Sequence, residues 1–237
     1  MGKRLLDLFC SAIGLILLSP LMAAVLVAVW LQDFKSPFYI ADRAGVGGRP
    51  FRMVKVRSMI VRADQSGVES TSASDPRITR VGHFVRRWKI DELSQLWNVL
   101  LGDMSLVGPR PNTLREVEQY RSAERDLLLV QPGITDISSI VFSDEGDILR
   151  TSSDPDKAYS ELIWPWKSRL GLFYIQNMSV RLDLQLICLT GLAIFNREAA
   201  LSRLVRLLRQ LGCDSQLCAI ASRKIPLQDV MQPVEQQ

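Results

Sequence analysis

Two adjacent carboxylates, Asp91 and Glu92, are the side chains in this sequence best suited to chemistry. Arg86 lies just upstream, and Arg110 stands between two prolines, where the rigid backbone presents its guanidinium at low entropic cost. Two acids flanked by fixed cations are the groups that a metal-assisted reaction on a phosphate requires. The same residues also fit a helix start, with Asp91 as the N-cap and Glu92 complementing the helix dipole. The spacing alone supports both interpretations.

An amphipathic helix is predicted directly after the carboxylate pair. Leu93, Leu96, Trp97 and Leu100 recur at i, i+3, i+4 and i+7, which places them on one helical face. Gly102 is expected to end this helix, because glycine readily adopts the conformation that follows a last helical turn.

A short β-hairpin is predicted over residues 36 to 60. Strand-forming stretches at 38–40 and 51–56 flank a glycine-rich turn at 45–48. Three basic residues in or next to these strands, Arg43, Lys55 and Arg57, could face a phosphate. Basic residues of this kind lie more often on a solvated strand face.

The N-terminal region contains an uncharged run from Leu8 to Leu31, preceded by Lys3 and Arg4. The run is long enough to cross a bilayer core of about 30 Å. Proline is expected to kink the helix at Ser19-Pro20, and the serine hydroxyl could satisfy the carbonyl that the proline leaves free. Because basic residues flank both ends, we expect a re-entrant helix with both ends cytoplasmic. The alternative is an ordinary kinked helix that spans the membrane.

Composition limits the classes of function. The net charge of +4 and the pI of about 9.0 suit anionic partners. With a single histidine, a histidine-based triad or a multi-histidine zinc site is disfavoured, so acid–base chemistry falls to carboxylates. Four cysteines show no metal-type spacing; Cys213 and Cys218 could pair, although a reduced cytoplasmic setting is the simpler interpretation.

The stretch from Lys89 to Pro111 resembles the signature of the bacterial sugar transferases, the monotopic phosphoglycosyl transferases. The shared motifs are the dyad Asp91-Glu92, QLWNV at 95–99, GDMSLVGPRP at 102–111, PGIT at 132–135, the Lys-Arg-x-x-Asp motif at Lys3, Arg4 and Asp7, and the Ser-Pro break at Ser19 and Pro20. Ala41 replaces a glutamine of the family pattern. The resemblance extends in pieces over most of the chain.

The resemblance implies transfer of a sugar 1-phosphate from a UDP-sugar to polyprenyl (undecaprenyl) phosphate, with release of UMP. This would be the first membrane step in the synthesis of a surface polysaccharide, such as an exopolysaccharide or lipopolysaccharide, or of another glycoconjugate. Asp91 would form a covalent aspartyl-phosphosugar intermediate, and Glu92 would bind Mg²⁺ or handle protons. Arg86 and Arg110, and less directly Arg57 and Lys55, are the expected phosphate-binding residues.

The expected fold class is α+β and mostly helical, with an N-terminal re-entrant membrane helix and a small cytosolic domain that contains the hairpin. The membrane helix occupies residues 1–34, the catalytic domain 35–195, and a basic amphipathic helix with a loose tail 196–237. Residues 201–209 either lie on anionic lipid or pack on the domain with their arginines in water. The resemblance places the chain at the cytoplasmic face of the bacterial inner membrane, as a monotopic protein.

Two other classes of function compete with this prediction. A membrane-anchored adaptor would use its basic face to bind acidic lipid or protein, and its activity would not depend on Asp91 or Glu92. A membrane-tethered nucleic-acid-binding protein should carry one basic stripe or motif, and none is evident, so nucleic acid is not an expected partner.

Overall fold

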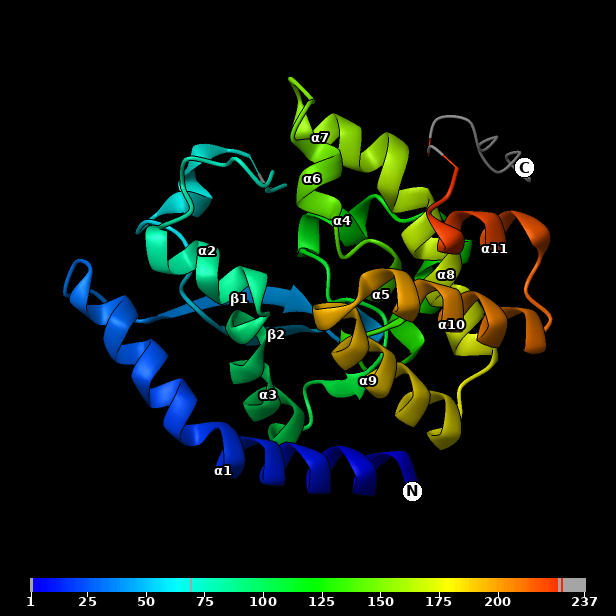
Figure 1. Ribbon diagram of the computed structural model, residues 1–237, viewed down its shortest axis with the longest axis horizontal. Helices are drawn as coiled ribbons and strands as arrows, with labels where there is room; N and C mark the ends of the chain where they lie inside the picture. Colours follow the sequence, from blue (N-terminus) through cyan, green and yellow to red (C-terminus); the bar gives the residue numbers. More distant parts are fainter. Residues whose placement is uncertain (1, 69, 226, 228–237) are drawn as a thin grey trace. The chain divides into compact units, whose positions relative to one another are not determined.

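The computed structural model describes residues 2–68, 70–225 and 227 (Figure 1). The described chain is mostly helical and contains a two-stranded antiparallel hairpin, which confirms the predicted fold class. It forms two compact units. The first runs to Gly67 and resumes from Asp75 to Ile134; the second contains Val68–Ser74 and continues from Thr135.

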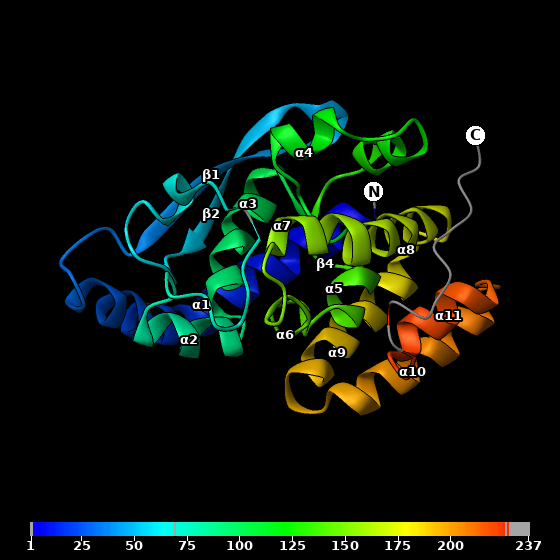
Figure 2. The ribbon, with the colours of Figure 1, turned by 90° about the horizontal axis from the view of Figure 1, so that it is seen from above.

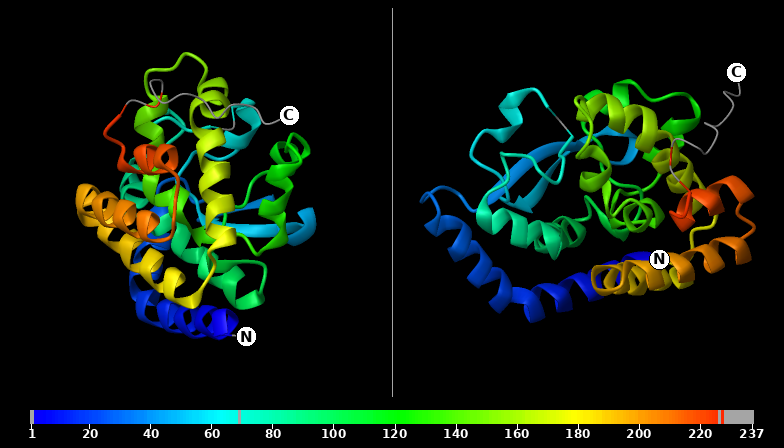
Figure 3. Two further views of the ribbon diagram at one scale, coloured as in Figure 1. Left: turned by 90° about the vertical axis from the view of Figure 1, so that its right-hand side faces the viewer. Right: turned by 45° about the horizontal axis from the view of Figure 1, so that its top comes forward.

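Helix α1 (Gly2–Leu31) is apolar and, among the described residues, the one helix long enough to cross a membrane. Its axis changes direction partway along, as Figures 1 and 3 show. Pro20 lies inside the helix and donates no backbone hydrogen bond to the carbonyl of Ile16. The Ser19 hydroxyl donates to that carbonyl instead, at 2.8 Å. The helix therefore bends without ending, and the predicted hydroxyl partner of the free carbonyl is present.

The first turns of α1 are attached to the first unit by the three residues of the Lys-Arg-x-x-Asp motif. Lys3 donates from Nζ to a carbonyl of β3 (Ser105–Val107) at 2.8 Å. Buried Asp7 accepts hydrogen bonds from a hydroxyl and an amide of the same strand, at 2.9 and 3.0 Å. Arg4 donates to two carbonyl oxygens in the last turn of α3 (Leu96–Leu101), at 2.6 and 3.0 Å.

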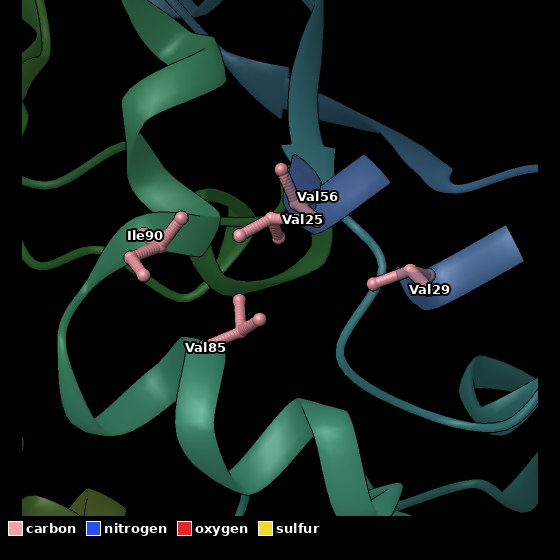
Figure 4. Packing of buried hydrophobic residues seen from close by; sticks show 5 residues of the cluster. All are labelled: Val25, Val29, Val56, Val85 and Ile90. Carbon is pink, nitrogen blue, oxygen red and sulfur yellow. The ribbon is translucent and has the colours of Figure 1, made fainter. Parts of the chain in front are cut away.

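The second half of α1 packs against the same unit through a cluster of buried valines and one isoleucine. Figure 4 shows the members, which are Val25 and Val29 from α1, Val56 from β2 (Pro50–Val56), Val85 from α2 (Arg80–Arg87), and Ile90. Both halves of α1 therefore pack against the rest of the first unit, to which the helix belongs. Its outward face, by contrast, exposes large apolar side chains such as Phe9, Ile16 and Leu17.

The hairpin consists of β1 (Phe38–Ala44) and β2 (Pro50–Val56), paired antiparallel with Lys55 opposite Tyr39. Its turn contains Gly47 and Gly48, both with positive φ, which glycine adopts without strain. The predicted hairpin is confirmed. The first unit also contains α4 (Leu114–Glu118) and a 3₁₀ helix over Ala123–Leu129, and strand β3 pairs with β4 (Gly133–Thr135).

The second unit is helical. Its helices are α5 (Ile137–Val141), α6 (Glu145–Leu149), α7 (Pro155–Ala158), α8 (Trp164–Gln176), α9 (Val180–Phe195), α10 (Arg197–Gln210) and α11 (Ser215–Ser222), with a π-helical turn at Tyr159–Ile163. Helix α10 lies beside α9 and α11 (Figure 2). Its leucines at 201, 204 and 208 are buried, while Arg203, Arg206 and Arg209 are exposed. Of the two alternatives for residues 201–209, the structure therefore shows packing on the domain, with the arginines at the surface.

Candidate active site

Asp91 and Glu92 lie in the first turn of a 3₁₀ helix, Ile90–Gln95, which continues directly into α3. Lys89 occupies the cap position, in the left-handed conformation with φ of 55°. Asp91 is therefore inside the turn rather than at the cap, so the capping interpretation does not describe this residue. The prediction of a single amphipathic α-helix was wrong for its first half, which is 3₁₀-helical. Gly102, with φ of +94°, ends α3 as predicted.

Polar side chains of this segment attach it to strand β2. The Ser94 hydroxyl donates to the carbonyl of Val54 at 3.0 Å. The side-chain oxygen of Asn98 accepts from the Val54 amide at 3.0 Å, and its nitrogen donates to the carbonyl of Arg52 at 2.8 Å. These bonds direct one side of the segment toward β2, so the apolar residues do not form one buried stripe, and Trp97 is 53% exposed. They also hold the carboxylate pair close to Lys55.

Two cations contact Glu92 directly. The Glu92 Oε1 atom lies 3.1 Å from Nη1 of Arg110 and 3.6 Å from Nζ of Lys55. The Glu92 side chain is 13% exposed and that of Lys55 is 17% exposed, so little solvent screens this pair. The expected proximity of Arg110 and Lys55 to the dyad is thus observed.

The position of Arg110 depends on close contact between two backbone turns. The Gly133 amide donates to the carbonyl of Pro109 at 2.9 Å. A Cβ atom at Gly133 would lie 2.1 Å from the nitrogen of Gly108, and one at Gly108 would lie 2.4 Å from the oxygen of Gln131. Only glycine fits at both positions, which explains why the Gly-Pro-Arg-Pro and Pro-Gly-Ile-Thr motifs occur together.

The two carboxylates of the dyad have opposite pKa shifts. Burial, followed by the neighbouring charge of Glu92, raises the pKa of Asp91. Burial acts in the same direction on Glu92, but the positive charges of Lys89, Lys55 and Arg110 together outweigh it and hold the pKa of Glu92 well below its usual range. Glu92 is therefore the permanent anion of the pair, while Asp91 is the more basic carboxylate.

The cations of the site are also perturbed. Burial, assisted by the charge of Arg110, lowers the pKa of Lys55 from 10.5 to about 8. Arg86 donates to the Ser58 hydroxyl at 3.4 Å, and its charge helps to stabilise the Asp91 carboxylate. Burial lowers the pKa of Arg86, but a guanidinium stays protonated at physiological pH.

Arg57 is engaged elsewhere. Its guanidinium forms a bidentate ion pair with Asp33, at 2.6 and 2.7 Å, and its Nε donates to the carbonyl of Ser36 at 2.7 Å. The side chain is buried and joins the chain just beyond α1 to the end of β2. In this arrangement Arg57 is a structural residue, and the structure does not bring it to the dyad.

A small hollow beside the dyad brings together Arg43, Lys55, Gln95 and Arg110. Arg43 comes from β1 and Gln95 from the end of the 3₁₀ helix. Arg43 is one of the basic residues predicted to be able to face a phosphate, and it stands with Gly45 in the Gln-x-Arg-x-Gly element of the family pattern. Gln95, which opens the QLWNV motif, was not predicted as a residue of the site. Three basic residues, Arg43, Lys55 and Arg110, thus line this hollow.

Within the site, the carboxylates of Asp91 and Glu92 are the groups that could hold the predicted divalent cation. Mg²⁺ prefers oxygen ligands and is commonly held by one or two carboxylates together with substrate phosphates. Asp91 and Glu92 would supply these carboxylates. In the part of the chain that the structure describes, no group of three or more His, Cys, Asp or Glu side chains is placed to hold a metal ion.

Comparison with known proteins places this site in a family. The chain is 35% identical to a UDP-glucose:undecaprenyl-phosphate glucose-1-phosphate transferase of Klebsiella pneumoniae, over 84% of this chain and 41% of that protein. It is 34% identical to a UDP-N-acetylgalactosamine-undecaprenyl-phosphate N-acetylgalactosaminephosphotransferase of Aeromonas hydrophila, over 78% of this chain and 41% of that protein. The chain thus spans about two fifths of the length of these relatives. The bacterial sugar transferase pattern matches residues 1–197, and the chain belongs to that family.

Proposed function

We propose that this protein transfers a sugar 1-phosphate from a UDP-sugar to polyprenyl phosphate and releases UMP, as the first membrane step in the synthesis of a surface polysaccharide or other glycoconjugate. The observation that carries the proposal is the dyad itself: two adjacent carboxylates with opposite pKa shifts, enclosed by Lys55, Arg86 and Arg110. The names of the relatives describe the same type of reaction for those proteins.

Asp91 is the proposed nucleophile. A carboxylate oxygen attacks the sugar-linked phosphorus, the bond from that phosphorus to the bridging oxygen breaks, and UMP leaves with the electron pair. A phosphate oxygen of the polyprenyl acceptor then attacks the same phosphorus and displaces the Asp91 carboxylate, which restores the enzyme. The raised pKa of Asp91 makes its ionised form the better nucleophile of the two carboxylates.

The surrounding charges allow an anionic nucleophile to approach a diphosphate. Arg110, Lys55 and Arg43 line the hollow beside the dyad and are proposed to bind the phosphates. Asp91 and Glu92 would hold Mg²⁺, which when bound supplies charge neutralisation of the diphosphate. Lys55 and Arg86 favour the charged form of Asp91 and partly offset the effect of burial and of Glu92, which raise its pKa.

The membrane arrangement is part of the proposal. Helix α1 is attached to the first unit near its start by Arg4 and Asp7, and along its second half by Val25 and Val29. With both halves of α1 held by one unit, a spanning orientation would draw part of that unit into the bilayer, which supports a re-entrant arrangement. We therefore infer a monotopic protein at the cytoplasmic face of the bacterial inner membrane, where its basic flanks also meet anionic lipid.

Site-specific cysteine labelling tests this topology. In sealed inner-membrane vesicles, cysteines placed at Ser36 and next to Lys3 should both label from the cytoplasmic face. Pro20→Leu, which restores the backbone donor inside the helix, should straighten α1 and favour a spanning orientation. Labelling next to Lys3 from the periplasmic face alone would refute the monotopic arrangement of the unmodified protein.

The half-reaction tests the chemistry. The purified protein is incubated with a panel of UDP-sugars without acceptor, and UMP release and intact mass are measured. We expect about one UMP per active site and a matching phosphosugar adduct, as a covalent mechanism requires. Asp91→Asn should abolish both signals. Asp126→Asn is the matched control, because Asp126 also lies in a 3₁₀ helix of the first unit but is exposed and outside the site.

Glu92→Gln separates the roles of the two acids. We expect it to slow UMP release severely, while adduct still accumulates on long incubation because the attacking carboxylate remains. A normal adduct in Asp91→Asn would show that the nucleophile is wrongly assigned. Turnover that requires both substrates together, with no burst from the wild type, would replace the covalent route by a single displacement.

A further inference from the structure

Helix α3 exposes two large apolar side chains beside the proposed active site. Trp97 is 53% exposed and Leu101 is 61% exposed. They are four residues apart on a helix and so share one face. Their neighbours Leu96 and Val99 are buried, which shows that α3 has a well-packed side and a separate apolar face directed outward.

Helix α3 packs against the membrane helix. A Cβ atom at Gly14 of α1 would be only 3.1 Å from Cδ1 of Leu96, so the two helices are in close contact. Arg4 donates to the carbonyls of Val99 and Leu100 at the end of α3. The packed side of α3 therefore lies on α1, and the last turn of α3, which contains Leu101, lies at the start of the membrane helix.

The depth of this face in the bilayer follows from the charges at the start of α1. Lys3 and Arg4 precede the apolar run and belong at the level of the lipid headgroups. Because Arg4 binds the last turn of α3, that turn lies at the same level. Trp97 lies one turn before Leu101 on the same face, and tryptophan favours the boundary between headgroups and acyl chains.

We propose that Trp97 and Leu101 bind the first isoprene units of the acceptor, and that this contact holds the acceptor phosphate beside Asp91. The inference rests on the proposed function. A lipid chain could contact the outward face of α1 at any point along that helix, and such a contact would not position its phosphate. A contact on α3 would position the phosphate, because α3 directly follows the segment that carries Asp91. The rise from Asp91 to Trp97 along the helical segment is about 10 Å, so a chain lying on this face carries its phosphate toward the nucleophile.

The test compares variants in the two half-reactions. Trp97→Ala and Leu101→Ala are measured beside Leu129→Ala, a matched control in the same unit whose leucine is 69% exposed. We expect each site variant to raise the KM for polyprenyl phosphate by about tenfold, since each loses part of an apolar contact with the chain. Trp97→Phe should restore most of the affinity. UMP release without acceptor and the KM for the UDP-sugar should stay as in the wild type.

A second measurement separates the acceptor from bulk lipid. Co-sedimentation with vesicles of phosphatidylethanolamine and phosphatidylglycerol should be the same for Leu101→Ala and the wild type. An unchanged KM for the acceptor, with a normal UMP burst, would overturn the acceptor site but leave the proposed function standing. Vesicle binding weakened by the same factor as the KM would show that the face contacts bulk lipid, which also overturns it. Absence of UMP release and of product in the wild type would instead contradict the proposed function.

Discussion

Lys55 provides the sharpest test of the electrostatics of this site. Burial and the charge of Arg110 lower its pKa from 10.5 to about 8, against the opposing effect of Glu92 and Asp91. That difference corresponds to a free energy of about 3 kcal/mol by which the empty site disfavours the ammonium form. A bound diphosphate would reverse the preference, because its negative charge stabilises the protonated amine.

The sign of the pH dependence follows from this shift. Below pH 8 Lys55 is charged in the free enzyme and attracts the diphosphate; above pH 8 it is neutral and the attraction is lost. Between pH 7 and pH 9 the charged fraction falls by about tenfold for a pKa of about 8, so kcat/KM for the UDP-sugar should fall by the same factor. The kcat value should change less, because bound substrate raises the pKa of Lys55.

The assay is UMP release without acceptor at subsaturating UDP-sugar, measured across this pH range. Lys55→Arg keeps a positive charge that does not titrate there, and it should therefore remove the alkaline decline. Lys157→Arg is the control, since Lys157 is 67% exposed and lies in the second unit. An equal alkaline decline in Lys55→Arg and the wild type, or no decline in the wild type, would refute the assignment of Lys55 as a phosphate-binding cation.

Three further predictions concern the dyad, the metal and α1. Because burial and Glu92 raise the pKa of Asp91 above 3.8, the rate of UMP release should fall with decreasing pH at a midpoint above that value, as a rate profile on the acid side will show. EDTA should abolish turnover and Mg²⁺ should restore it; full activity in metal-free protein would leave the arginines and Lys55 as the only neutralising charges. Asp7→Ala leaves a hydroxyl and an amide of β3 without their acceptor and should lower the free energy of unfolding by about 3 kcal/mol, with a smaller loss for Asp7→Asn, measured by chemical denaturation.

Several elements could be predicted from the sequence because their signals are local. The Ser19-Pro20 pair predicts the hydroxyl that completes the hydrogen bonding of α1, and this bond occurs, while the helix continues through the proline. Gly102 ends α3, and the glycine-rich turn at 45–48 joins the two strands of the hairpin. Each of these features depends on the conformation of one or two residues, which their side chains determine directly.

The features that could not be predicted depend on contacts between distant parts of the chain. Arg57 has the same local pattern as a phosphate-binding residue, yet Asp33 occupies its guanidinium. The 3₁₀ start of the dyad segment arises where Ser94 and Asn98 bind the backbone of β2, and no periodicity within the segment indicates that pairing. Arg43 reaches the hollow through the register of the hairpin, which also requires knowledge of the fold.

The contacts of α1 suggest why a membrane helix with a break belongs to this active site. Along its length α1 meets the segment from Ile90 to Leu101 in reverse order: Arg4 binds the last turn of α3, Gly14 lies against Leu96, and Val25 packs in the cluster that contains Ile90. The dyad segment therefore rests on the membrane helix from end to end. A straight helix could not follow a compact unit in this way, so the bend that keeps α1 at one membrane surface also keeps it in contact with the residues that carry Asp91 and Glu92. Movement of α1 in the membrane would be transmitted to the dyad through these contacts rather than through a flexible linker.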